Sequence, residues 1–82
     1  MIPRIKNIQP CADYMLLVQF DDDRKVMYDV KEDINVITDF KVLLTEHGLF
    51  ENVQLNSSRT CVYWNERIDI PSDTIMEYGK QI

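Results

Sequence analysis

Residues 60–73, TCVYWNERIDIPSD, decide the fold that this 82-residue chain is expected to adopt. The segment holds the only tryptophan, Trp64, in a short run where apolar side chains alternate between two faces, as in a strand. Asn65 then begins a tight connection to a second short strand, which Pro71 ends. Ser72 is a favoured residue at a helix start. The segment therefore predicts a strand, a turn, a strand and a helix in immediate succession.

The region upstream predicts a β-hairpin. Residues 14–20, YMLLVQF, place apolar side chains on both faces, which is typical of a central strand. Three aspartates and Arg24 interrupt this pattern, and aspartate favours turns because its side chain bonds the local backbone. Residues 25–29 return as the paired strand. Shorter strands are expected at residues 2–8 and 52–55.

One main helix is expected between these strands. Thr38 or Asp39 is a suitable N-cap, and Gly48 is a suitable stop. Between them, apolar residues and the only histidine recur at helical spacing on one face: Phe40, Leu43, Leu44 and His47. A short C-terminal helix over residues 73–78 is expected to end at Gly79 and to close the core with Ile75.

The chain is therefore expected to form a single α+β domain over residues 1–82. We predict a small antiparallel or mixed sheet of about five to six short strands, with the hairpin first. This sheet packs against one main α-helix, with a short C-terminal helix beside it. Val62 and Trp64 are expected to lock the sheet to the first helix.

The composition excludes several classes of protein. Fourteen acidic residues against nine Lys and Arg give a net charge of −5, and the positive residues are scattered, so direct nucleic-acid binding is not expected. An acidic surface attracts basic partners instead. No apolar run is long enough to span a membrane, and the N-terminus lacks the apolar block of a signal peptide. We expect a cytoplasmic protein.

The sequence contains no assembled catalytic, cofactor-binding or metal-binding motif. Cys11 and Cys61 are 50 positions apart, which is no zinc or redox spacing, and we expect small thiols that are buried or half-buried. The aspartates at 21–23 lack the glycine and the distal glutamate of a calcium loop. His47 is either a helix-end residue or, as the alternative, a ligand or base. We expect no catalytic residue, no cofactor and no metal ion.

Asp29 and Asp69 are candidate functional residues because each ends a strand of apolar and aromatic residues. In one interpretation they accept hydrogen bonds from backbone amides of the following turn or helix. In the other they line a shared groove with aromatic side chains, as protein-binding hot spots do. Tyr63 lies on the strand face opposite Trp64 and is the better surface contact. The candidate partner-contact residues are Tyr28, Asp29, Tyr63, Arg67 and Asp69.

The order of these features resembles a small bacterial family, the domain of unknown function 2442 (DUF2442). Its landmarks correspond here to Pro3 and Ile5; Tyr14, Leu16, Val18, Phe20 and Asp29; Phe40, Leu43, Phe50 and Val53; and Trp64, Asp69, Ile70, Asp73 and Ile75. The chain departs from the family in two turns. Asp23 stands where the family favours glycine, and residues 65–67 stand where it favours proline and glycine. The resemblance implies the fold and a genetic setting beside toxin–antitoxin partners. Some members carry an added helix-turn-helix domain, which we do not expect within these 82 residues.

Together these observations predict a non-enzymatic interaction or regulatory module. Its partner is expected to be a protein, as in an acidic, antitoxin-like chain that binds a neighbouring basic protein, or a second copy in a homodimer. The alternative is a small ligand-binding domain or enzyme with a pocket near His47 and Asp29.

Overall fold

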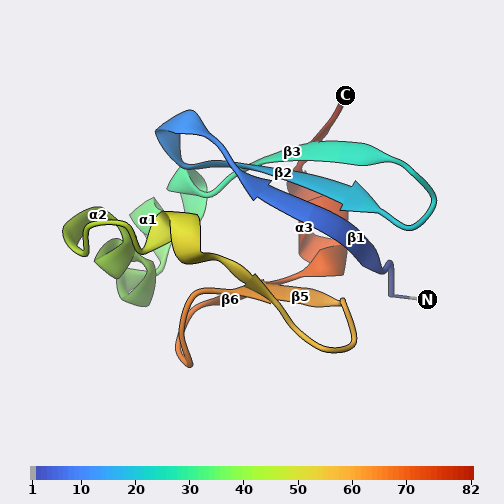
Figure 1. Cartoon of the computed structure of the whole chain (residues 1–82). Helices are drawn as coiled ribbons and strands as arrows, with labels where there is room; N and C mark the ends of the chain where they lie inside the picture. Colours follow the sequence, from blue (N-terminus) through green and yellow to red (C-terminus); the bar gives the residue numbers. More distant parts are fainter. Residues whose placement is uncertain (1) are drawn as a thin grey trace.

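The computed structural model describes residues 2–82 and shows two antiparallel sheets that face each other (Figure 1). The four-stranded sheet has the order β1-β2-β3-β7, with β1 (Ile5–Pro10), β2 (Met15–Phe20), β3 (Lys25–Asp29) and β7 (Lys80–Gln81). The three-stranded sheet has the order β4-β5-β6, with β4 (Gln54–Leu55), β5 (Cys61–Tyr63) and β6 (Asp69–Pro71). β2 is central, as its apolar pattern on both faces predicts.

Short helices close the ends of the sheet pair. α1 (Lys31–Val36) and α2 (Val42–Thr45) lie together at one end (Figure 1). α3 (Ser72–Tyr78) connects β6 of one sheet to β7 of the other. Three single turns of 3-10 helix complete the described chain: η1 (Ala12–Tyr14), η2 (Thr38–Lys41) and η3 (Phe50–Asn52). The fold class is therefore α+β with antiparallel sheets, as expected.

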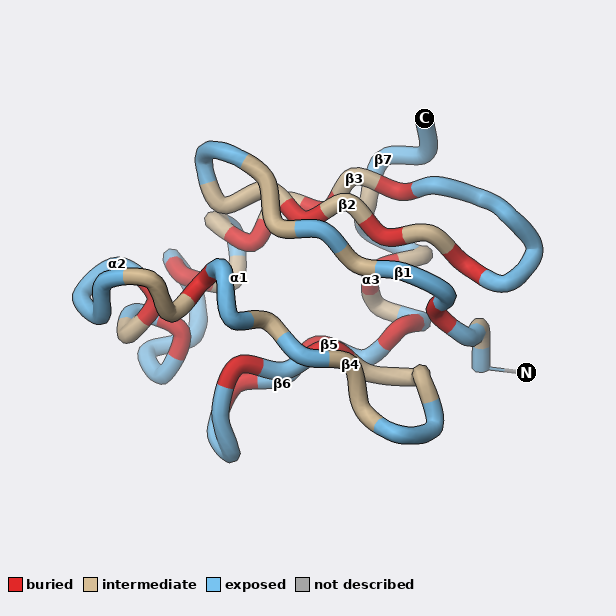
Figure 2. Tube along the Cα trace, in the orientation of Figure 1, coloured by how far each residue is buried: buried red, intermediate tan, exposed pale blue. Residues whose placement is uncertain are grey.

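The hydrophobic core fills the space between the two sheets. Alternate residues of β2 and β3 are buried, and Figure 2 shows this alternation of buried and partly buried positions along the strands. The three-stranded sheet contributes its own inward residues, and α3 contributes Ile75. Core residues from these elements and the adjoining turn are each 6% exposed or less: Leu16, Val18, Phe20, Val26, Val62, Trp64, Ile68, Ile70 and Ile75.

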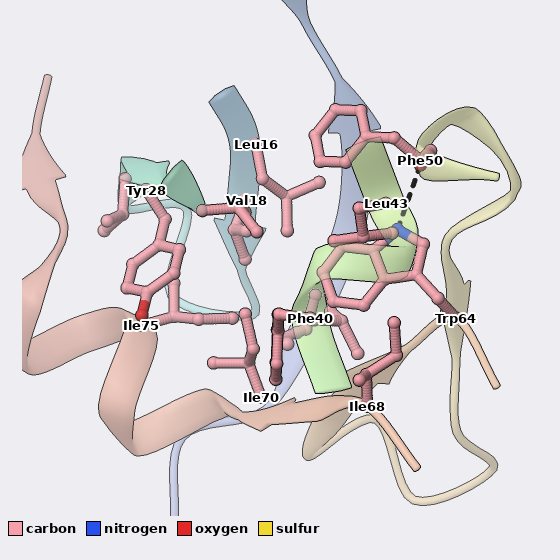
Figure 3. Close-up of a cluster of buried hydrophobic side chains, with 14 of the residues drawn as sticks. Leu16, Val18, Tyr28, Phe40, Leu43, Phe50, Trp64, Ile68, Ile70 and Ile75 are labelled. Carbon is pink, nitrogen blue, oxygen red and sulfur yellow. Dashed lines mark hydrogen bonds between the residues drawn. The ribbon is translucent and has the colours of Figure 1, made fainter. Parts of the chain in front are cut away.

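Trp64 joins the three-stranded sheet to the segment that follows α2 (Figure 3). Its indole Nε1 donates a hydrogen bond to the backbone oxygen of Phe50 at 3.0 Å. Its ring stacks on the Phe50 ring, with centroids 6.0 Å apart, and meets the Phe40 ring edge-on at the same distance. Buried indoles need such a partner for their N–H group. Trp64 therefore locks its sheet to the segment that contains Phe40 and Phe50, as expected, although this segment does not form the predicted helix.

The prediction of one main helix over residues 40–47 is wrong. The segment forms the 3-10 turn η2 and the four-residue helix α2, and neither Thr38 nor Asp39 makes a capping hydrogen bond. Phe40 and Leu43 are buried as expected, but Leu44 is 54% exposed. His47 is exposed and lies beyond the end of α2, so it is not a helix-end residue. The longest helix is instead α3.

The physical reason lies in the position of Phe50. The chain turns at Gly48, which has φ of +81°, and this reversal carries Phe50 back under Trp64. A helix that continued through His47 would carry the backbone past this position. Isolated helices of this length are marginal, so packing in the core outweighs the local pattern.

The prediction of a single sheet is also wrong. The chain forms two sheets that pack face to face around the core, and their edges do not pair. One backbone hydrogen bond, from Ile5 N–H to the Arg59 oxygen at 2.7 Å, links β1 to the loop before β5. The last residues, expected to be a short tail, form the edge strand β7 against β3.

Ser72 has a different role from the helix cap expected of it. Its hydroxyl is completely buried and donates to the backbone oxygen of Pro3 at 2.6 Å, while its N–H donates to the Thr60 oxygen at 2.8 Å. A buried hydroxyl must find a partner, and this partner lies 69 positions away in the chain. Ser72 therefore fastens the N-terminal segment to the start of α3.

The β2–β3 loop supplies a first prediction. Two bonds close it, from Phe20 N–H to the Arg24 oxygen and from Asp23 N–H to the Phe20 oxygen, both 2.9 Å long. Asp23 has φ of +71°, at the position of such loops that favours glycine. Its side chain contacts only exposed groups, Lys6 at 3.2 Å and Gln19 at 3.3 Å.

We expect Asp23→Gly to raise the free energy of unfolding by about 0.5 kcal/mol, because relief of the left-handed backbone exceeds the loss of a surface ion pair. Urea denaturation followed by circular dichroism measures this. The control is Asp22→Gly in the same loop, which removes the bonds from Asp22 to Arg24 without relieving a positive φ and should destabilise. Equal effects of the two substitutions would contradict the prediction.

Candidate functional site

The five candidate contact residues lie in two separate places. Tyr28 and Asp29 end β3 in the four-stranded sheet, whereas Tyr63, Arg67 and Asp69 belong to the β5–β6 hairpin of the other sheet. The structure therefore does not assemble the shared groove that one interpretation of the sequence predicts. Each group has to be considered by itself.

Tyr28 belongs to the core. Its side chain is 5% exposed, and its hydroxyl donates to Oδ2 of Asp33 at 2.6 Å, which ties β3 to α1. Burial, and then the hydrogen bond to Asp33, raise the pKa of the Tyr28 phenol well above its ordinary value. With so little exposed surface, Tyr28 stabilises the fold and offers little to a partner.

This pair gives a prediction about pH. The folded state keeps the Tyr28 proton to higher pH than the unfolded chain, which loses it near the ordinary pKa of about 10. The hydrogen bond therefore contributes its full stabilisation of the folded state below pH 10, and this contribution falls as the pH rises above 10. We expect Tyr28→Phe to lower the free energy of unfolding by about 1–2 kcal/mol at pH 8. The difference from the wild type should shrink by about 1 kcal/mol between pH 9 and pH 11.

Urea denaturation of both proteins across this pH range measures the effect. Tyr78→Phe is the matched control, because Tyr78 is 70% exposed. A constant difference between wild type and Tyr28→Phe from pH 8 to pH 11 would contradict the prediction.

Asp29 caps the backbone, in agreement with the first interpretation of the sequence. Its Oδ1 accepts a hydrogen bond from the Lys31 N–H at 2.9 Å and an ion pair from Lys31 Nζ at 3.1 Å. These contacts turn the chain from β3 into α1. Asp29 is half-buried, so its main role at this point is to shape the turn.

Two residues of the second group, Tyr63 and Asp69, present their side chains on the outer face of the three-stranded sheet. The inner row of this sheet is Leu55, Val62 and Ile70, and the outer row is Gln54, Tyr63 and Asp69, aligned across β4, β5 and β6. Tyr63 is 37% exposed and Asp69 is exposed. The period of two along each strand makes this division, because Val62 and Trp64 take the inner side.

Arg67 lies in the turn between β5 and β6, where it lines a hollow with Asn65 and residues of the η2–α2 segment. The side-chain oxygen of Asn65 accepts hydrogen bonds from the backbone N–H of Arg67 at 2.7 Å and of Ile68 at 3.1 Å. The Trp64 N–H donates to the Ile68 oxygen at 3.1 Å and closes the turn. The tight connection predicted at residues 65–66 is confirmed, and it presents the Arg67 side chain to solvent.

Cys61 lies on the same outer face, half-buried and opposite Pro71. Burial, and then the nearby charge of Asp69, raise the pKa of its thiol. A thiol is a nucleophile only as the thiolate, so this environment makes Cys61 less reactive. Its place here is that of a small packing residue, as expected.

His47 lines a shallow, open hollow of about 450 Å³ with Cys11, Tyr14 and Phe50. The sequence offered no signal that Cys11 and His47 would share a surface, because the turn at Gly48 brings them together. Asp29 is not among the lining residues, so the pocket imagined near His47 and Asp29 does not contain both. Among residues 2–82, no group of three or more His, Cys, Asp or Glu side chains is placed to hold a metal ion.

These features define a class: a small α+β domain of two facing antiparallel sheets, with an aromatic and acidic row on one outer face. The chain belongs to the family described as protein of unknown function (DUF2442), whose model matches residues 5–81. The resemblance seen in the sequence is thereby confirmed. Comparisons with curated proteins and with solved structures return no match. Within the described residues, no helix has the length and apolar character needed to cross a membrane.

Proposed function

We propose that this domain is a non-enzymatic interaction module that binds a basic protein through the outer face of the three-stranded sheet. The observation that carries the proposal is the position of Tyr63. Its aromatic ring stands outside the core, between Gln54 and Asp69 on a rigid sheet, and the core does not need it because Val62 and Trp64 fill the inner side. Tyrosines held in this way are typical anchors of protein interfaces.

Charge supports a basic partner. The segment that carries this face, residues 60–79, contains four acidic residues and only Arg67 as a base, so its net charge is −3. A local excess of negative charge raises the rate at which a positively charged protein associates and helps to orient it. Asp69 lies directly across from Tyr63 and would pair with a lysine or arginine that flanks the tyrosine.

An antitoxin-like, regulatory role fits this surface. An acidic domain with a single aromatic face can cover a basic surface on another protein and block its action. The alternative function, a ligand site or enzyme built on His47 and Asp29, is less well supported, because these two residues do not line one hollow.

The test is co-expression of this chain with the proteins that the adjacent genes encode, followed by affinity purification and calorimetry of any basic protein captured. We expect a complex that weakens with added salt. Tyr63→Ala should weaken it by about 10-fold or more, and Asp69→Lys should slow association most strongly at low salt.

Tyr78→Ala is the matched control, because Tyr78 is an exposed tyrosine on α3, away from the Gln54–Tyr63–Asp69 row. A complex that tolerates Tyr63→Ala and Asp69→Lys as well as Tyr78→Ala would overturn the assignment of this face. Failure to capture the neighbouring basic protein at micromolar concentration would count against the function itself.

A further inference from the structure

The outer face of the four-stranded sheet is apolar at its centre and uncovered. Met15, Leu17 and Met27 alternate with the core residues of β2 and β3 and so point away from the core. The three-stranded sheet and the core residues of α1 and α3 all lie on the opposite side (Figures 1 and 2). Methionine side chains are adaptable and occur often at binding surfaces. This face has the apolar centre of an interface.

The strand register arranges this face in rows. The middle row runs across all four strands: Gln9, Leu17, Met27 and Lys80. On β3, Lys25 lies two residues before Met27 and Asp29 lies two residues after it, at about 7 Å to either side. The outer face therefore has two ends that are placed symmetrically about the middle row.

The two ends carry opposite net charge. At the Lys25 end, Asp23 accepts a hydrogen bond from Lys6, so this ion pair and Lys25 leave a net charge of +1. At the Asp29 end, Lys31 Nζ pairs with both Asp13 and Asp29, at 3.1 Å each, and lies 3.7 Å from the sulfur of Met15. Two aspartates and one lysine leave a net charge of −1 there.

We propose that a second copy of this chain docks on this face, sheet against sheet, about a two-fold axis that runs along the middle row. This axis turns β3 of one copy antiparallel over β3 of the other. Leu17 and Met27 then meet their own counterparts, and Lys25 of each copy lies over Asp29 of its partner. An isologous interface must be self-complementary in this way, and opposite charges placed symmetrically about the axis satisfy the requirement.

The charge of the remaining surface also selects this face. Its four lysines and three aspartates sum to +1, so the other charged residues of the chain, eleven acidic and five basic, sum to −6. Two copies that approach through any strongly acidic face repel each other. The dimer would leave both Tyr63 faces outward and free, so this inference goes beyond the proposed function and stands without it.

Sedimentation velocity of the full chain over a range of concentrations tests the dimer. We expect a concentration-dependent monomer–dimer equilibrium in which Leu17→Glu weakens association on the order of 100-fold, because each substitution acts twice across the axis. Lys25→Glu should weaken it by about fivefold at low salt and less at high salt. Tyr63→Glu on the other sheet is the matched control and should dimerise as the wild type does.

A second measurement does not depend on the stability of these variants. With Cys11 and Cys61 replaced by alanine, a short bismaleimide cross-linker should join Met27→Cys between copies, because the two positions face each other across sheets that pack about 10 Å apart, whereas Tyr63→Cys should not be joined. A chain that stays monomeric at millimolar concentration overturns the proposal. So does a dimer that Leu17→Glu leaves intact, or one that Met27→Cys does not cross-link.

Discussion

Replacement of Trp64 by alanine is expected to lower the free energy of unfolding by about 3–5 kcal/mol, which is most of the stability of a domain of this size. The indole is 6% exposed and contacts two other aromatic rings, those of Phe40 and Phe50. Alanine would leave a cavity between the three-stranded sheet and the η2–α2 segment. It would also leave the Phe50 carbonyl without its donor.

Urea denaturation followed by far-ultraviolet circular dichroism measures this loss without depending on tryptophan fluorescence. Trp64→Phe is an intermediate case, because it keeps one aromatic ring but removes the N–H donor together with the second ring of the indole. We expect it to lose about 1–3 kcal/mol. Tyr63→Ala, one residue earlier but on the outer face, should change stability by less than about 1 kcal/mol. An unchanged melting temperature for Trp64→Ala would mean that the ring lies outside the core.

Replacement of Gly79 by alanine has the second largest expected effect, a loss of about 2–3 kcal/mol. A Cβ atom at this position would lie 2.2 Å from Cγ1 of Val26 and 2.6 Å from the backbone oxygen of Ile75. The Gly79 N–H donates to that same oxygen at 2.9 Å, which ends α3. The backbone at Gly79 is extended, so the glycine is needed for space rather than for its dihedral angles.

Relief of this clash would require α3 to move away from β3, and β7 would be the first element lost, since it pairs with β3 at only two positions. Amide hydrogen exchange at residues 80–82 should therefore rise along with the fall in stability. Gly48→Ala is the control: no atom lies within 4 Å of its Cβ position, and only its φ of +81° opposes alanine. It should cost about 1 kcal/mol. A Gly79→Ala protein as stable as Gly48→Ala would contradict the close packing of α3 on β3.

The two glycines illustrate how far sequence reasoning reached. Both were predicted to end helices, and Gly79 does so. Gly48 instead turns a loop, because the helix before it already ends at Thr45. The glycines correctly predicted that the chain changes direction at both positions. The length of α2, in contrast, depends on the packing of Phe50 against Trp64.

The candidate site shows the same division. The alternation of residues in β5 predicted that Trp64 points inward and Tyr63 outward, and this is what the sheet shows. The grouping of Tyr28 and Asp29 with Tyr63 was wrong, because it required the two hairpins to share one groove. They pack face to face, which places Tyr28 in the core and Asp29 in a turn.

The sequence by itself determined the family, the α+β class, the β2–β3 hairpin and the opposite orientations of Trp64 and Tyr63. These features depend on contacts within about ten residues, where periodicity and turn chemistry act directly. Only the tertiary structure decided that there are two sheets, that Ser72 holds Pro3, that the last residues form β7 and that the outer face of the four-stranded sheet stays uncovered. Each of these depends on a contact between residues far apart in the chain, and a local sequence pattern does not specify which distant residues will come into contact.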